Sequence, residues 1–312
     1  MMNPFVLFIK IIILFGVLVI SQWGLLSPVY GQSISVEQDL NRGADVQKRR
    51  LFTFAFFPET SKEKMEGRYA RLVKLLSKTF NGDLTDKQGR VVSGEFVFET
   101  RPNYLSYMEA IDEEKFDIAV VNAFDYVKIK NTTRYIPIVS RSDTLVANIV
   151  TSNKKINDLL DLKNKQIGFA TQYSSASIAA KYMFLKHEIF SSDYSTYYFN
   201  GHIPCLDSVY ENNTDVCVTG ERIFNKYPNE KKSKLTVIAK GEPLPQLVVL
   251  LHPSLAHKQN EIREFFLALQ ESPQGKIILD ETYLVSLENF MGEKYYLCEL
   301  LLDYISSHED IN

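Results

Sequence analysis

The sequence lacks an excess of basic residues. Its 312 residues carry 35 Lys and Arg against 38 Asp and Glu, and the formal net charge is −3. Nucleic-acid-binding domains usually have a basic patch and a high isoelectric point. The isoelectric point near 6.0 therefore gives no indication of a nucleic-acid partner. With 45% hydrophobic residues, the chain has enough apolar material for substantial buried cores.

The sequence also lacks the common motifs of catalysis and metal binding. It contains no nucleophile turn of the G-x-S-x-G type, no H-E-x-x-H motif, no phosphate-binding glycine loop and no histidine pair at metal-ligand spacing. Four of the histidines, His187, His252, His257 and His308, are scattered among polar neighbours. These absences argue against an enzyme, a metal site and a bound cofactor.

Cysteine is scarce, with three residues: Cys205, Cys217 and Cys298. Their spacing does not suggest a metal site. Three thiols buried as small apolar side chains are the simpler interpretation. The alternative is one disulfide, most simply between Cys205 and Cys217, which an exported protein permits.

The first residues have the pattern of an export signal. Lys10 precedes the apolar run 11–20, and the small residues Val29 and Gly31 stand where a signal peptidase would cleave. We therefore interpret residues 1–31 as a signal peptide.

An uncleaved membrane anchor is the alternative, because residues 5–26 approach the ~20 residues that a spanning helix needs. No cysteine follows the apolar run, so a lipid-anchored form is not expected. Both interpretations place the body of the protein in the periplasm or another extracytoplasmic space. Residues 32–49 are polar and aperiodic and form a leader.

Strand and helix patterns alternate along the first part of the fold. Strands are expected at 51–57, 94–100 and 116–122, helices at 66–79, 104–114 and 123–127, and a turn at 81–93. Alternation of this kind predicts right-handed crossovers and a largely parallel sheet.

The alternation resumes after a change of pattern near Asp143. Strands are expected at 145–151, 166–170, 196–199, 215–219, 235–239 and 246–251, and helices at 156–162, 177–187, 204–212, 261–269, 273–279 and 294–306. We predict an α/β fold with two lobes, each a mostly parallel sheet flanked by helices, joined by two extended crossovers. Lobe 1 comprises 50–143 and 246–312, and lobe 2 comprises 144–245.

A polar turn, Thr171–Ser177, separates the strand at 166–170 from the next helix. It contains three serines, a threonine and a glutamine. A helix start has unpaired backbone N–H groups and the positive end of the helix dipole, so hydroxyls gathered there can hold an anion. Simple N-capping is the alternative, because Ser and Thr are favoured caps at any helix start.

Five segments, in order, resemble the solute-binding proteins of ABC transporters for phosphonate, phosphite and related oxyanions. They are FDIAVVNAFDYV at 116–127, NDLLDLKNKQIGFATQYSSAS at 157–177, GHIPCLDSVYENNTDVCVTGERIF at 201–224, KGEPLPQLVVLLHPSL at 240–255 and EIREFFLALQESPQGKIIL at 261–279. The resemblance covers roughly residues 51–290 and implies a type 2 periplasmic binding-protein fold. In that family, the ligand sits between lobes that close by hinge bending.

The resemblance also implies particular binding residues. The family's Ser/Thr turn falls on Ser174, Ser175 and Ala176, its tyrosine at the start of the second helix on Tyr104, and its loop histidine on His202.

This chain departs from the family pattern at three places. Asn122 follows the third strand, Ser177 replaces a glycine, and Gly220 with Glu221 replaces a polar position. An unpaired Glu221 would favour a ligand that also carries an amine or a hydroxyl donor, and its alternative is a solvated glutamate at a helix start. The predicted ligand-binding set is Tyr104, Asn122, Gln172, Tyr173, Ser174, Ser175, Ser177, His202 and Glu221.

The function implied is a monomeric binding protein that clamps a small phosphonate- or phosphate-like ligand and delivers it to an ABC permease. The alternative is a ligand-sensing partner of a membrane signalling protein. No second membrane segment or output domain follows, so a sensor would need a separate membrane partner. The helix at 294–311 either supplies a docking surface for that partner or covers the first lobe.

Overall fold

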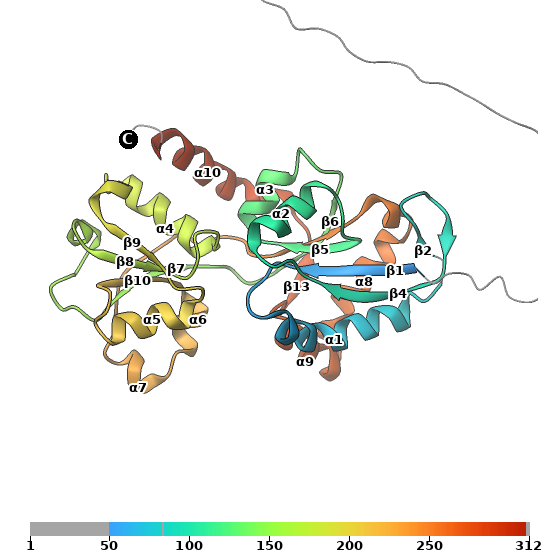
Figure 1. Cartoon of the computed structure of the whole chain (residues 1–312), viewed down its shortest axis with the longest axis horizontal. Helices are drawn as coiled ribbons and strands as arrows, with labels where there is room; N and C mark the ends of the chain where they lie inside the picture. Colours follow the sequence, from blue (N-terminus) through green and yellow to red (C-terminus); the bar gives the residue numbers. More distant parts are fainter. Residues whose placement is uncertain (1–49, 83, 310–312) are drawn as a thin grey trace, which may run out of the picture. The chain divides into compact units, whose positions relative to one another are not determined.

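The computed structural model describes residues 50–82 and 84–309, all within one compact unit that spans Val46–Asn312 (Figure 1). The expected signal peptide 1–31 and leader 32–49 lie outside the described residues. Among the residues described, no helix is long and apolar enough to span a membrane.

The first sheet has six strands in the order β13-β6-β12-β5-β1-β4. Its strands are β1 (Arg50–Phe56), β4 (Gly94–Glu99), β5 (Ile118–Val121), β6 (Ile136–Arg141), β12 (Val248–Leu251) and β13 (Leu287–Asn289). β1, β4 and β5 run parallel, whereas β12 pairs antiparallel to β5 and β6.

Helices cover both faces of this sheet because side chains alternate along its central strands. Phe52, Phe54 and Phe56 of β1 are fully buried in one cluster, and Ala55 belongs to another. The helices associated with this sheet are α1 (Lys62–Thr79), α2 (Tyr104–Asp112), α3 (Ala123–Ile129), α8 (Gln259–Ala268) and α9 (Pro273–Glu281).

The second sheet has five strands in the order β11-β7-β10-β8-β9. Its strands are β7 (Ala147–Thr151), β8 (Gln166–Phe169), β9 (Ser195–Tyr198), β10 (Val216–Gly220) and β11 (Thr236–Lys240). β9, β8 and β10 run parallel, and β7 is antiparallel to its neighbours β10 and β11. The helices are α4 (Ser175–Lys186), α5 (His202–Tyr210), α6 (Glu221–Lys226) and α7 (Asn229–Lys232).

Two extended segments connect the sheets. They pair once, through Leu145 and Leu244, whose backbone N–H groups each donate to the other's carbonyl at 2.8 and 2.9 Å. Two helix-flanked sheets joined in this way confirm the predicted fold class. Strand membership agrees with lobe 1 as 50–143 with 246–312 and lobe 2 as 144–245, and we retain that division as our interpretation.

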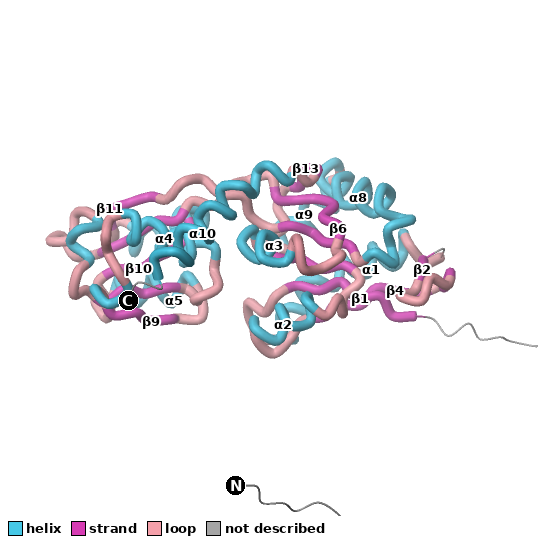
Figure 2. The backbone as a smooth tube through the Cα atoms, turned by 90° about the horizontal axis from the view of Figure 1, so that it is seen from above, coloured by secondary structure: helices cyan, strands magenta, loops and turns pink. Residues whose placement is uncertain are grey.

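The C-terminal helix α10 (Tyr296–Glu309) packs on both parts of the fold rather than on the first alone (Figures 1 and 2). Glu299 forms an ion pair with Lys130, directly after α3, at 2.8 Å. Near the other end, the rings of Tyr304 and of Tyr182 in α4 form a T-shaped pair, with centroids 5.2 Å apart. The helix therefore contacts elements from both sheets.

Several local expectations need correction. The expected turn at 81–93 contains a small hairpin of β2 (Leu84–Thr85) and β3 (Val91–Val92). The expected helix at 156–162 is a 3₁₀ turn at Leu159–Leu162, capped by Asp158. β6 and β13 were not anticipated.

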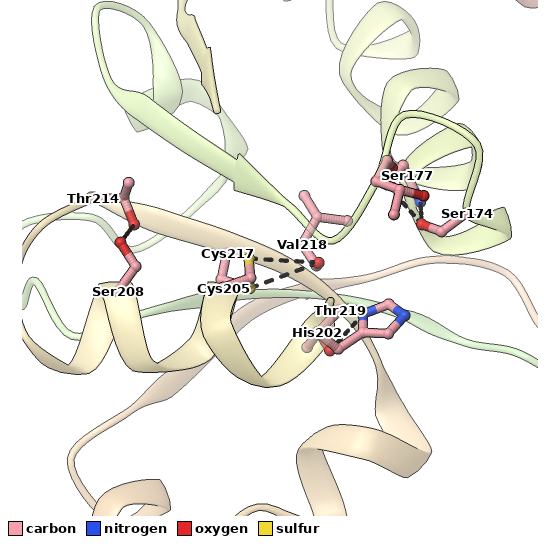
Figure 3. The surroundings of a disulfide bond; sticks show 10 residues. Ser174, Ser177, His202, Cys205, Ser208, Thr214, Cys217, Val218 and Thr219 are labelled. Atoms are coloured by element: carbon pink, nitrogen blue, oxygen red, sulfur yellow. Dashed lines mark hydrogen bonds between the residues drawn. A yellow bond between two sulfur atoms is a disulfide. The ribbon is translucent and has the colours of Figure 1, made fainter. Parts of the chain in front are cut away.

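The cysteines also differ from the simpler expectation. Cys205 of α5 and Cys217 of β10 form a disulfide, and both are fully buried (Figure 3). Cys298 is a free, buried thiol, as expected for a small apolar side chain. The bond fastens α5 to the strand it covers.

Candidate functional site

The predicted site residues gather at the carboxyl ends of parallel strands. α4 and α5 begin after β8 and β9, and α2 and α3 begin after β4 and β5. In Figure 3, Ser174, Ser177 and His202 lie at one end of the second sheet, and the Ser208–Thr214 pair lies toward the other. Loops at the carboxyl edge of an α/β sheet are the usual place for a ligand.

The serine turn is held by hydrogen bonds of its own. Ser174 is the N-cap of α4, and its Oγ accepts from the backbone N–H of Ser177 at 3.1 Å. Ser177 is fully buried, and its hydroxyl donates to the carbonyl of Thr171 at 2.6 Å. The two serine oxygens lie 2.7 Å apart, so the Ser174 hydroxyl donates to Ser177 Oγ. Both hydroxyl protons are therefore already used.

The remaining donors at this helix start come from Ser175 and Ala176. Within the described residues, neither backbone N–H has a hydrogen-bond partner, and the partly buried Ser175 hydroxyl has none either. These groups lie at the positive end of a 12-residue helix. Ser174 caps the helix, as the N-capping alternative has it. Anion binding by the turn stays a prediction, for which Ser175 and two backbone N–H groups remain as donors.

Tyr173 brings the turn into contact with the first sheet. Its ring stacks on that of Tyr104, with centroids 4.5 Å apart and planes 4° from parallel. Its N–H donates to Thr171 Oγ1 at 3.3 Å, and the neighbouring Gln172 side chain is exposed.

Tyr104 also belongs to a polar cluster at the starts of α2 and α3. Its hydroxyl donates to Asp125 Oδ2 and accepts from Asn122 Nδ2 at 2.6 Å. Asn122 Nδ2 also donates to Asp125 Oδ2 at 2.5 Å, and Asn122 Oδ1 caps α3 by accepting from the Asp125 N–H. Three side chains therefore share one compact network.

Asp125 was not singled out from the sequence. Its side chain is buried, with 4% exposure, and burial raises the pKa of its carboxyl from 3.8 to about 7, with Lys128 acting in the opposite direction. The available signal was an acid three residues after a strand-end Asn, at a helix start. Nothing in that pattern indicates that the carboxyl would be buried.

His202 is the first residue of α5 and lies beside the end of β10. Its Nδ1 is 3.2 Å from Oγ1 of the fully buried Thr219 (Figure 3). Burial lowers the pKa of the imidazole to about 4, so the ring is neutral at neutral pH. A neutral ring can offer a ligand either a donor or an acceptor.

Glu221 begins α6, and its carboxylate lies 2.5 Å from Nζ of Lys240. Its charge is already paired, so the premise of an unpaired Glu221 that selects an amine does not hold. Glu221 does begin a helix, as the alternative of a solvated helix-start glutamate has it, but its carboxylate is paired with Lys240. The carboxyl group that contacts Tyr104 is that of Asp125.

A cavity of about 450 Å³ lies along α2, and none of the predicted binding residues lines it. Three of its side chains are acidic and one is basic, which disfavours an anion. It is lined by Arg101, Ser106, Glu109, Ala110, Asp112 and Glu113. In the part of the chain that the structure describes, no group of three His, Cys, Asp or Glu side chains is placed to hold a metal ion.

Comparison with known families gives one match over most of the chain. Residues 54–295 match the family described as "ABC transporter, phosphonate, periplasmic substrate-binding protein". No curated protein matches the chain by sequence.

Solved structures share the fold at low sequence identity. PhnD1 from Prochlorococcus marinus, solved with methylphosphonate, is 15% identical over 82% of this chain and 98% of its own, with a TM-score of 0.69. A binding protein of an ABC phosphonate transporter from Pseudomonas aeruginosa is 14% identical over 83% and 87%, with a TM-score of 0.65. The aliphatic sulphonate-binding protein SsuA from Escherichia coli is 12% identical over 82% and 92%, with a TM-score of 0.55.

Proposed function

Because the chain belongs to the family of periplasmic substrate-binding proteins of phosphonate ABC transporters, we propose that it binds a small phosphonate- or phosphate-like oxyanion between its two sheets. The ligand is then delivered to an ABC permease. Members of this family bind and hand over substrates rather than transform them.

The observation that carries the proposal is the start of α4. Two backbone N–H groups and the Ser175 hydroxyl are present there without partners in the described residues. Several uncharged hydrogen-bond donors at the positive end of a helix can stabilise an anion without a cationic side chain.

The second sheet's site is completed by residues from the first. The Tyr104 ring contacts the turn by stacking on Tyr173, and Asn122 Nδ2 donates to the Tyr104 hydroxyl at 2.6 Å. His202 adds a neutral group on the side of β10. A ligand that touches Ser175 and Tyr104 together would favour the closed arrangement of the two lobes.

Relatives with the same fold support this class of ligand. PhnD1 was solved with methylphosphonate, and SsuA binds aliphatic sulphonates. In both ligands, the charged group is a set of oxygen atoms around a phosphorus or sulfur atom.

The proposal also includes export directed by residues 1–31, with an uncleaved membrane anchor as the alternative, and a monomeric state. No observation favours the signalling alternative.

A thermal-shift screen tests the ligand class. The purified protein would be heated with phosphate, phosphite, methylphosphonate, 2-aminoethylphosphonate, methanesulfonate, glycine or putrescine. A ligand that binds only the folded protein raises the melting temperature by mass action. Stabilisation by one or more oxyanions is the expected result. Stabilisation by amines alone, or by none of the compounds, would contradict the proposal.

A further inference from the structure

We propose that oxyanion binding at this site is coupled to the uptake of one proton by Asp125, which acts through the hydroxyl of Tyr104. The inference rests on the proposed function and adds a second ligand, the proton. Asp125 is in this sense a positioning residue, because it contacts Tyr104 rather than the oxyanion.

The first step is a count of protons in the cluster. The Tyr104 hydroxyl has one proton, and it goes to Asp125 Oδ2. Asn122 Nδ2 has two, and one of its N–H groups faces the cluster and is shared between Tyr104 Oη at 2.6 Å and Asp125 Oδ2 at 2.5 Å. With Asp125 ionised, the proton of the Tyr104 hydroxyl is therefore held inside the cluster. The phenol oxygen then presents only lone pairs to the site, which repel an oxyanion.

Protonation of Asp125 reverses the direction of one hydrogen bond. A proton from solvent binds Oδ2, and the new O–H group donates to Tyr104 Oη. The phenol keeps its own proton, which rotates away from Asp125 and becomes available to the ligand. No other bond is made or broken, and the charge of the cluster changes from −1 to zero.

The surroundings of Asp125 permit this protonation near neutral pH. α2 contributes Tyr104, the turn before α4 contributes Tyr173 against the Tyr104 ring, and α3 contributes Lys128. Lys128 favours the ionised form, but burial outweighs it and raises the pKa of Asp125 to about 7. A buried carboxyl without a close cation gains from protonation when an anion arrives beside it.

The coupling has a measurable consequence. If only the protein with Asp125 protonated binds tightly, the apparent dissociation constant is the intrinsic value divided by the protonated fraction. Affinity should therefore fall by about tenfold for each pH unit above about 7. A ligand with no proton of its own shows this most clearly.

Titration calorimetry with methanesulfonate and methylphosphonate tests the coupling. Native protein would be titrated between pH 6 and 8.5 in two buffers of different ionisation enthalpy, which gives the protons taken up per ligand bound. Methanesulfonate does not titrate in this range. We expect its uptake by native protein to approach one proton at pH 8 and to be much smaller at pH 6.

Variants assign the proton. Asp125→Asn has an amide that can donate to Tyr104 permanently, so its affinity at pH 8 should rise about tenfold over native and change less than twofold with pH. Methylphosphonate carries its own protons, so the informative quantity is the number of protons taken up by native protein minus the number taken up by Asp125→Asn. This difference should approach one at pH 8. Asp112→Asn, at an exposed position on α2, is the matched control and should behave as native.

The outcomes separate the two claims. If either probe binds, and native protein and Asp125→Asn take up the same number of protons on binding it, the coupling is overturned and the proposed function stands. If neither probe binds native protein at any pH, both the proposed function and this inference fail. Were Asp125→Asn not to fold, methanesulfonate binding to native protein without uptake would still overturn the coupling.

Discussion

The ring of Tyr104 lies flat against the ring of Tyr173, with centroids 4.5 Å apart. Tyr104 begins α2 beside the first sheet, and Tyr173 stands in the turn before α4 beside the second. The stack therefore forms only when these two edges approach each other. It is a direct contact between the two groups of predicted binding residues.

Removal of one ring should weaken ligand binding. An aromatic pair contributes about 0.5–1.5 kcal/mol, so Tyr173→Ala should lower affinity for methylphosphonate about 2- to 10-fold. Titration calorimetry measures the change. Tyr197→Ala, at an exposed tyrosine of β9, is the control. An affinity that is unchanged or higher in Tyr173→Ala would contradict a closing role for the stack.

Ser175 and Ser177 should give opposite results on truncation. Ser177→Ala removes a buried hydroxyl that donates to Thr171 and leaves Ser174 without its acceptor, so the free energy of unfolding should fall by about 1–3 kcal/mol. Ser175→Ala removes a hydroxyl with no partner among the described residues, so stability should hardly change while oxyanion affinity falls. Urea unfolding and calorimetry on both variants measure this. Equal losses of oxyanion affinity in the two variants would argue against a binding role for Ser175 and a stabilising role for Ser177.

Asp125 should make the protein less stable as pH rises. Its folded pKa of about 7 exceeds its ordinary 3.8, so the folded state holds more protons than the unfolded state between these values. Its contribution to stability is present below about pH 4 and is lost as pH rises toward 7, by up to about 4 kcal/mol.

The effect of Asp125 on stability must be measured against a variant, because the histidines change the stability with pH in the opposite direction. His202 and His252 have pKa values lowered to about 4, so their contribution falls as pH drops below their ordinary 6.5. The stability of Asp125→Asn minus that of native protein isolates the carboxyl. This difference should grow from pH 4 to pH 8, and a flat difference would show that Asp125 is not buried as described.

The disulfide should contribute to stability rather than to binding. Cys205 and Cys217 are separated by 12 residues, and closure of a loop of that size is worth about 3 kcal/mol in the unfolded chain. Dithiothreitol should therefore lower the unfolding free energy of native protein. The double variant Cys205→Ala with Cys217→Ala should lose this response, whereas Cys298→Ala should retain it. A native protein that is insensitive to reduction under unfolding conditions would contradict the bond.

The sequence predicted the alternating parts of the fold well and the irregular parts poorly. Buried strands such as β5 and β10 are short apolar runs between helix patterns, so they were recognisable. β6 was missed because Pro137 interrupts its pattern, and proline argues against an internal strand. The pairing of β12 with β6 shifts register between Val249 and Leu250, where Leu250 lies opposite Pro137. This irregularity lets the strand include the proline.

The elements that carry the candidate site were predictable, but the contacts within it were not. The serine turn and Tyr104 could be placed by pattern and resemblance. The roles within the turn depend on which hydroxyl faces inward, and sequence alone could not separate Ser175 from Ser177. The burial of Asp125 and the pairing of Glu221 with Lys240 were both missed, because the surroundings of a carboxyl depend on the folded structure and not on the residues next to it in the chain.

The most direct test of oxyanion binding at α4 is calorimetric titration of Ser175→Pro with methylphosphonate. Proline fits the first position of a helix, and Ser174 already has the extended backbone that must precede it, with φ −69° and ψ 141°. The chain uses the same arrangement at Ser272 and Pro273 of α9. The substitution removes both the Ser175 N–H and its hydroxyl. We expect a native melting temperature with affinity lowered at least about tenfold, since two hydrogen bonds to a charged ligand are lost. Native affinity in a folded Ser175→Pro protein would place the ligand elsewhere.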